Sequence, residues 1–160
     1  MTEHDASASQ LLADTGDAIV EGVERTLPGW LAARSARVLD AWGRLDDPGA
    51  RADVDDAITN AAVAATARVV SELRAVFSTA PEHQRATPLQ IVRTAYREPS
   101  AVLVTAGVPD VRRDEFEERT SPDDHYGFAL HTLADLDPDL GPLQLAWGLA
   151  KSRVLRADAP

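Results

Sequence analysis

Cysteine is absent from the 160 residues of the chain, and lysine occurs once, at Lys151. Without cysteine the protein has no disulfide bond, no thiol nucleophile and no site in which thiolates bind zinc or an iron–sulfur cluster. Aromatic residues are also scarce, at 5% of the chain. Because alanine-rich helices bury little surface per residue, we expect the few large rings to supply core volume. These rings are Trp30, Trp42, Phe77 and Trp147.

Positive charge is in short supply as well. The formal net charge is −10 and the pI is about 4.7, whereas proteins that bind nucleic acids or anionic membranes carry an excess of positive charge. Nucleic acid is therefore disfavoured as a partner. The hydrophobic fraction of 44% is ordinary for a globular protein. We predict a single helical domain over residues 1–160, with a disordered tail at residues 1–6.

The sequence has no apolar run long enough to cross a membrane. The longest apolar stretch, residues 61–70, contains Thr66 and Arg68 and is too short to span a bilayer. Residues 1–9 are polar and lack the basic and apolar regions of a signal peptide. We therefore predict a cytoplasmic protein without a membrane partner.

What the sequence does contain is one long stretch with helical periodicity, residues 53–78, uninterrupted by glycine or proline. At 1.5 Å per residue this helix would extend over roughly 35–40 Å, while a compact chain of this length has a radius of gyration of about 15 Å. We therefore predict an all-α fold, an irregular helical bundle built on this long alanine-rich helix. Its apolar positions are spaced by three and four: Val54, Ile58, Ala61, Ala65, Val69, Leu73 and Val76.

The N-terminal third predicts two shorter helices. Ser7 opens a capping-box sequence, so we expect the first helix to begin there. We expect it to break at residues 26–28, where Pro28 starts the second helix. Gly16 and Gly22 lie inside the first helix, and we interpret them as a kink or a late start rather than as close contact with the alanines of the long helix. On the exposed side of the second helix we expect Arg34, Arg37 and Arg44.

After the long helix the sequence predicts two short helices and a last, longer one. Thr87 before Pro88 is typical of a helix cap followed by a first-turn proline. A second short helix is expected over residues 99–106, and the last helix is expected to begin near Pro142.

A loop-rich, acidic insert precedes this C-terminal helix. We expect a charged helix over residues 110–119, followed by turns. Thr132 and Asp135 have the spacing of a capping box, which predicts one helical turn there.

The insert is the best candidate for a metal site, because it concentrates acidic residues and two histidines. Metal-assisted hydrolysis would need carboxylate and imidazole ligands converging on one point, with a position open for water. The spacing matches no established ligand pattern. We therefore favour an interpretation in which the acids serve turns and caps and the histidines lie at the surface or pack. The candidate ligands are Asp123, Asp124, His125, His131 and Asp135.

The leading functional hypothesis is a non-enzymatic protein–protein interaction or regulatory module, with a protein partner or a second copy of itself. We identify no catalytic constellation, no phosphate-binding glycine loop and no dinucleotide fingerprint, and we predict no cofactor. Apolar residues of the insert either line a partner groove or close the core. They are Phe116, Tyr126, Phe128 and Leu130.

Two alternatives stay open. One is a metal-dependent hydrolase that uses the Asp- and His-rich segment, residues 110–139. The other is a small-molecule-binding helical domain with a pocket lined by Trp30, Trp42 and Trp147. The first alternative requires His125 and His131 to converge with a carboxylate in a cleft.

Overall fold

The computed structural model describes residues 3–42, 48–106 and 130–157. Every regular element in these residues is a helix, which confirms the predicted all-α fold. In the described part of the chain, no helix is both long and apolar enough to span a bilayer. The α-helices are α1 (Glu3–Trp42), α2 (Pro48–Phe77), α3 (Pro88–Arg93), α4 (Glu98–Thr105) and α7 (Leu140–Ala157), and the 3-10 helices are η1 (Pro81–His83), η2 (Thr94–Arg97) and η3 (Leu133–Asp135).

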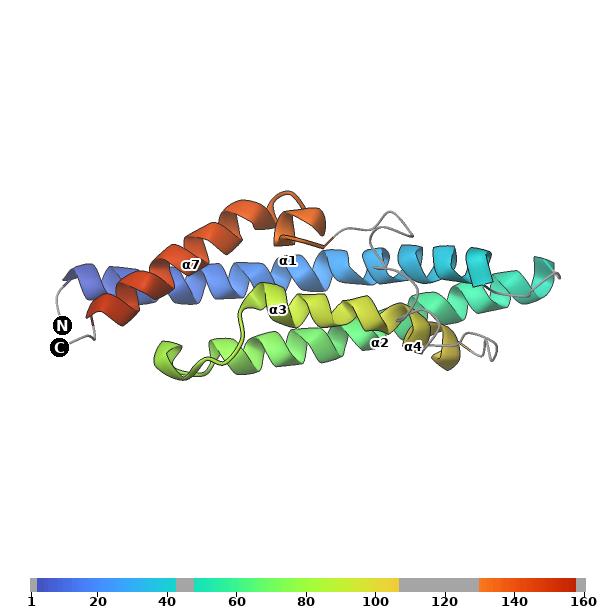
Figure 1. Cartoon of the computed structure of the whole chain (residues 1–160), viewed down its shortest axis with the longest axis horizontal. Helices are drawn as coiled ribbons and strands as arrows, with labels where there is room; N and C mark the ends of the chain where they lie inside the picture. Colours follow the sequence, from blue (N-terminus) through green and yellow to red (C-terminus); the bar gives the residue numbers. More distant parts are fainter. Residues whose placement is uncertain (1–2, 43–47, 107–129, 158–160) are drawn as a thin grey trace.

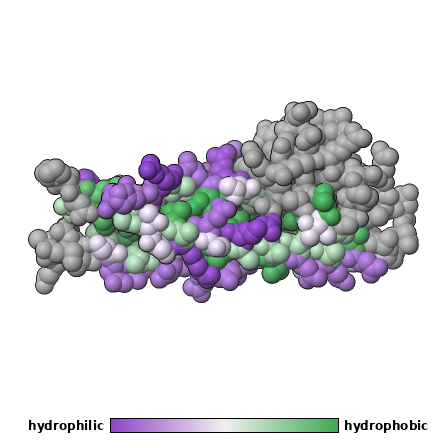
Figure 2. All heavy atoms as spheres, turned by 90° about the horizontal axis from the view of Figure 1, so that it is seen from below, coloured by the Kyte–Doolittle hydropathy of each residue, from purple (hydrophilic) through white to green (hydrophobic). Residues whose placement is uncertain are grey.

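The described helices form an elongated bundle around an antiparallel pair, α1 and α2 (Figure 1). The shorter helices share the length of this pair. α7 runs back along the N-terminal half of α1, whereas α4 contacts both α1 and α2 towards the other end of the bundle (Figure 1). Polar residues cover much of the face shown in Figure 2, with apolar residues exposed between them.

The predicted long helix is present as α2 and is unbroken. It begins at Pro48, five residues before the predicted start. Proline is tolerated in the first turn of a helix, and Gly49 is the one poor helix former between Pro48 and Asp53. The prediction that this helix is the element on which all others pack was incomplete. α1 has 40 residues and at 1.5 Å per residue extends about 60 Å, and it contacts α2, α4 and α7.

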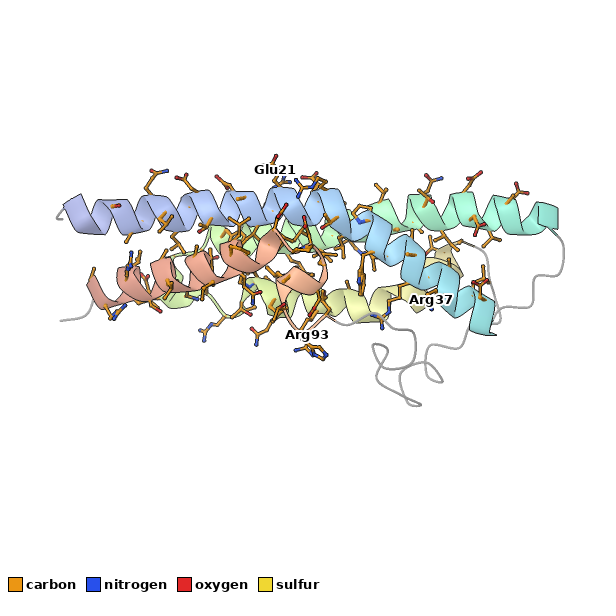
Figure 3. All side chains as sticks on the ribbon, turned by 90° about the horizontal axis from the view of Figure 1, so that it is seen from above. Glu21, Arg37 and Arg93 are labelled. Atoms are coloured by element: carbon orange, nitrogen blue, oxygen red, sulfur yellow. The ribbon has the colours of Figure 1, made fainter. Side chains whose placement is uncertain are left out.

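The predicted break at residues 26–28 was wrong, since α1 continues through Pro28. Proline costs a helix interior about 3 kcal/mol, because it removes one backbone hydrogen bond and crowds the preceding turn. On either side of it, Leu27 and Leu31 are both fully buried, and each contributes about 2 kcal/mol or more by leaving water. Packing therefore outweighs the local cost. α1 responds by changing direction part-way along, as Figure 3 shows.

α1 begins at Glu3, within the segment predicted as a disordered tail, and residues 1–2 lie outside the described residues. Ser7 lies inside α1 and does not begin it. No glycine or proline separates Glu3 from Ser7, so the sequence contains no residue that would stop the helix before Ser7.

The two glycines of α1 provide close contact rather than a kink. A Cβ at Gly16 would lie 3.3 Å from the ring of Phe77, the last residue of α2. A Cβ at Gly22 would overlap the Cδ2 atom of Leu140, the first residue of α7. The preference for a kink was therefore wrong, and the neighbours are a ring and a leucine rather than the alanines of α2.

Arg34 is buried, whereas the sequence placed it on the exposed side of its helix. It is 0% exposed, and its guanidinium carbon lies 5.0 Å from the centre of the Trp30 ring. The reason is its spacing. Arg34 follows the buried Leu31 by three residues, so both lie on one face of the helix, whether or not the helix is broken at Pro28. Arg37 is exposed as predicted, and Arg44 lies outside the described residues.

The cap predicted at Thr87 is present at the start of α3. The Thr87 hydroxyl accepts a hydrogen bond from the backbone N–H of Gln90, and the Gln90 side chain accepts one from the N–H of Thr87. α4 begins one residue before its predicted start and α7 two residues before Pro142, differences within the usual uncertainty of helix ends. The helix predicted over residues 110–119 lies outside the described residues.

Glycine replacement tests the close contact between α1 and α7. Gly22→Ala should lower the free energy of unfolding by about 1–2 kcal/mol, because the added methyl group overpacks a core that is already filled by Leu140. Gly29→Ala is the matched control, since an added Cβ there meets nothing within 4 Å. It should raise the free energy of unfolding by about 0.5–1 kcal/mol. Urea unfolding followed by circular dichroism measures both, and equal stabilisation by the two variants would contradict the contact.

Candidate functional site

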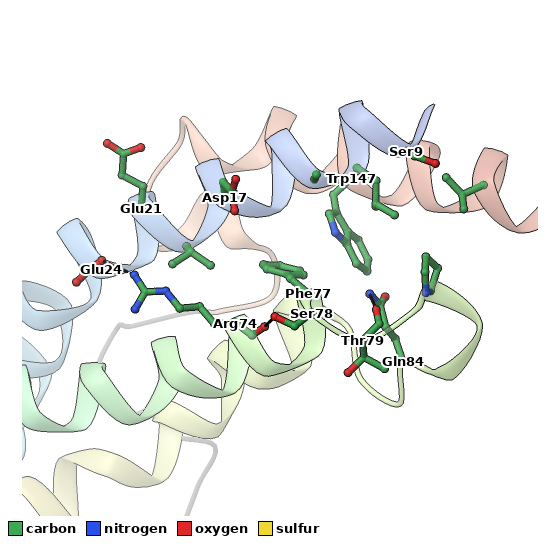
Figure 4. Close-up of a pocket in the computed structure, with 15 residues that line it drawn as sticks. Ser9, Asp17, Glu21, Glu24, Arg74, Phe77, Ser78, Thr79, Gln84 and Trp147 are labelled. Carbon is green, nitrogen blue, oxygen red and sulfur yellow. Dashed lines mark hydrogen bonds and ion pairs between the residues drawn. The ribbon is translucent and has the colours of Figure 1, made fainter. Parts of the chain in front are cut away.

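A groove of about 710 Å³ opens between the N-terminal half of α1, the C-terminal end of α2, the connection after α2 and one side of α7 (Figure 4). Its apolar lining comes from three helices that lie far apart in the sequence. α1 contributes Leu12 and Val20, α2 contributes Phe77, and α7 contributes Trp147 and Val154. The groove therefore exists only where all three helices pack together.

Two aromatic rings form the centre of the apolar floor. The ring centres of Phe77 and Trp147 are 5.7 Å apart and their planes are inclined by 50°, a geometry in the favourable range for aromatic pairs. Gly16 allows the Phe77 ring to lie against the backbone of α1. The ammonium of Lys151 lies 5.1 Å from the centre of the Trp147 ring. These contacts hold the two rings in place, so the floor is preformed by packing among α1, α2 and α7.

One edge of the groove is acidic. Asp17, Glu21 and Glu24 line it from α1, at spacings of four and three that place them along one side of the helix. Arg74 of α2 pairs with Glu24 at 3.5 Å, and both side chains are more than half exposed, so this pair contributes at most about 1 kcal/mol. Three carboxylates and one guanidinium give the lining a net charge of −2. The Glu21 carboxylate points away from the floor and marks the outer rim (Figures 3 and 4).

The connection after α2 closes one end of the groove, and Gln84 holds it in place. The Gln84 amide nitrogen donates hydrogen bonds to the backbone carbonyls of Val76 and Thr79, each at 3.1 Å. The amide oxygen of Gln84 is buried and accepts no hydrogen bond within the described residues. This wall is thus tied to the end of α2, with one buried acceptor left unsatisfied.

The hydroxyl groups of this wall donate hydrogen bonds to backbone carbonyls of the last turn of α2. Ser78 donates to the carbonyl of Arg74 at 2.8 Å, and Thr79 donates to the carbonyl of Ala75 at 2.9 Å. No histidine, cysteine or lysine occurs among the described residues that line the groove. The lining thus combines apolar rings with exposed carboxylates, an arrangement suited to binding an amphipathic cation.

Among the predicted metal ligands, two lie in the described residues. The Asp135 carboxylate accepts hydrogen bonds from the backbone N–H groups of His131 and Thr132, at 2.8 and 2.9 Å, and so caps η3 as its spacing predicted. The His131 side chain is exposed. Within residues 3–42, 48–106 and 130–157, no three His, Asp or Glu side chains are placed to hold a metal ion. The other candidates, Asp123, Asp124 and His125, lie outside those ranges.

Of the apolar residues assigned to a partner groove, Leu130 is the one that the structure describes. It is fully buried and belongs to the core, which fits the alternative that these residues close the core. Phe116, Tyr126 and Phe128 lie outside the described residues.

The three tryptophans do not line one pocket in the described structure. Trp147 lies in the floor of the groove, whereas Trp30 packs beside Arg34 and does not line it. The side chain of Trp42 is not among those described.

The acidic row on α1 was visible in the sequence as carboxylates at helical spacing, but it was not selected as a site. Carboxylates at such a spacing are common on solvated helix faces. The three carboxylates indicate a binding site only because Phe77 and Trp147 lie beside them in the same groove. The position of these two rings depends on how α2 and α7 pack against α1.

Comparison with known proteins finds no significant match to any family model, curated protein or solved structure.

Removal of the Asp135 carboxylate tests its role as a cap. Asp135→Ala should lower the free energy of unfolding by about 1 kcal/mol, because two backbone N–H groups lose their acceptor. Asp135→Asn retains an oxygen acceptor and should recover most of the loss. Urea unfolding with and without EDTA measures both variants. A loss of stability that disappears in EDTA would instead identify Asp135 as a metal ligand.

Proposed function

We propose that this protein is a non-enzymatic protein-interaction module whose groove binds a basic, amphipathic segment of a partner protein. The observation that carries the proposal is the position of the acidic row on α1 beside the aromatic floor formed by Phe77 and Trp147. A partner needs apolar side chains for the floor and cationic side chains for the rim.

The floor would supply most of the affinity. Large apolar side chains of a partner would leave water on contact with Leu12, Val20 and Phe77, and each fully buried side chain contributes about 1.5–3 kcal/mol before the costs of association. Aromatic residues commonly dominate binding energy at interfaces. Because the Phe77 ring is already packed against Gly16 and Trp147, little ordering of the floor is needed.

The acidic row would supply selectivity. Asp17 and Glu24 are separated by seven residues, or about 10 Å along the helix axis. An amphipathic helix with lysine or arginine at spacings of three and four presents cations over the same length. The net charge of −10 adds a long-range attraction for such a segment. Charge complementarity of this kind affects the association rate and the choice of partner more than the affinity.

The groove volume also falls within the range of small-molecule sites, which is about 300–1,000 Å³. A small amine would contact the floor and one carboxylate, whereas a peptide helix would contact the whole row. The number of carboxylates that contribute to binding therefore distinguishes the two ligands.

Neutralisation of the acidic row tests the proposal. The probe is a fluorescent 18-residue peptide of leucine and lysine with helical amphipathic spacing, titrated with protein and followed by fluorescence anisotropy. The variant Asp17→Asn/Glu21→Gln should bind it about 5–20-fold more weakly, because two cations lose their partners while the floor is unchanged.

The matched control is Asp56→Asn/Glu72→Gln, which changes the net charge equally at two exposed positions of α2 outside the groove. It should bind the peptide within about twofold of the unmodified protein. Equal weakening in the two double variants would show non-specific attraction to an acidic protein and contradict the groove. Weakening by Asp17→Asn alone, with none from Glu21→Gln, would favour a small ligand.

A further inference from the structure

The outward face of α7 exposes two leucines near its centre and has no covering element in the described structure. Leu145 and Leu149 are 66% and 52% exposed, while Trp147 and Ala150 on the opposite side of the same helix are buried. Leu145, Leu149, Ser152 and Arg156 are spaced by four, three and four. This is the seam spacing through which one helix packs along another.

Charge is divided along the same helix. α7 contains no acidic residue, and its three cations, Lys151, Arg153 and Arg156, all lie in its C-terminal half. Asp137 and Asp139 immediately precede its first residue. Asp137 is already paired with Arg25 at 2.9 Å, whereas Asp139 is exposed. A helix with one acidic end and one basic end complements an antiparallel copy of itself.

From this we infer that two copies of the chain pair through the outward faces of α7, antiparallel across a two-fold axis near Trp147 and Gly148. In this register Leu145 packs against the partner's Leu149, and Asp139 lies opposite the partner's Arg156. The midpoints of both pairs fall at or just after Trp147, so one axis satisfies the apolar and the charged contacts together. Two-fold pairing requires such self-complementarity.

Gly148 permits the close approach that this axis requires. A Cβ at Gly148 would meet nothing within 4 Å, so packing among the described residues does not account for a glycine there. A glycine inside a helix costs about 1 kcal/mol relative to alanine. At the crossing point of two helices the absence of a side chain lets the backbones approach.

The pairing leaves the groove open. Trp147 and Val154 line the groove from the inward side of α7, and the seam lies on the opposite side. A dimer would thus present two grooves, and a partner with two basic segments would gain apparent affinity from binding both. The inference does not depend on the proposed function of the groove.

The seam is short, so the dimer should be weak. α7 has 18 residues and two exposed leucines face outward at its centre, whereas standard stable interfaces bury about 800 Å² per partner. We expect a dissociation constant in the micromolar range, on the order of 10–500 µM.

Sedimentation velocity over a concentration series tests the pairing. Leu149→Glu should make the protein monomeric up to the highest concentration measured, since it places a carboxylate in the seam. Val63→Glu is the matched control, because Val63 is equally exposed, at 54%, on α2, and it should dimerise like the unmodified protein. Circular dichroism verifies that both variants are folded. A strict monomer for the unmodified protein at millimolar concentration would overturn the inference.

A charge exchange tests the antiparallel register. Asp139→Arg and Arg156→Glu, each alone, bring like charges together and should weaken dimerisation about tenfold. The double variant exchanges the two charges and should restore dimerisation close to the original level. Failure of the double variant to restore it would contradict this register.

Engineered cysteines locate the axis, because the natural chain has none. Under oxidation Gly148→Cys should form a disulfide-linked dimer, since residue 148 lies near its own copy at the axis. Ser152→Cys should remain mostly unlinked, because two copies of residue 152 would be about 14–15 Å apart along the helices, beyond the reach of a disulfide. Efficient cross-linking of Ser152→Cys together with little cross-linking of Gly148→Cys would indicate a parallel pair. The groove variant Asp17→Asn/Glu21→Gln should dimerise normally, so loss of peptide binding and loss of pairing are separable.

Discussion

The unbroken apolar face of α1 is the contact on which the rest of the structure depends. Ile19, Val23, Leu27 and Leu31 are all fully buried along it, and α2, α4 and α7 all pack against this helix. Because α1 continues through Pro28, the same helix positions the groove near one end of the bundle and buries Arg34 towards the other. A break at Pro28 would free these two regions to move independently.

α7 connects the groove to the outer surface. Its inward side contributes Trp147 to the groove floor, and its first residue, Leu140, fills the space left by Gly22. Its outward side carries Leu145 and Leu149 at the surface. The two sides of one helix therefore serve two different contacts, and each contact can be altered without the other.

The sequence predicted features that depend on local chemistry and failed where distant packing decides. The helical class, α2 and the caps at Thr87 and Asp135 followed from periodicity and cap spacing. The break predicted at Pro28 was wrong because the free-energy cost of a proline inside a helix is smaller than the free energy gained by burying Leu27 and Leu31. The groove could not be predicted, because its rings and carboxylates come from helices whose relative positions the sequence pattern does not specify.

Amide hydrogen exchange in α1 tests the continuity of this helix most directly. If α1 is unbroken, the N–H groups of Gly29, Trp30 and Leu31 donate to carbonyls one turn earlier, before Pro28, and should exchange slowly, with protection similar to that of Leu73, which is fully buried on α2. If a new helix began at Pro28, the N–H groups of Gly29 and Trp30 would have no helical acceptor and would exchange rapidly, whereas the N–H of Leu31 would still donate to the carbonyl of Leu27. Rapid exchange confined to Gly29 and Trp30 would contradict the continuous α1 and the groove geometry that depends on it.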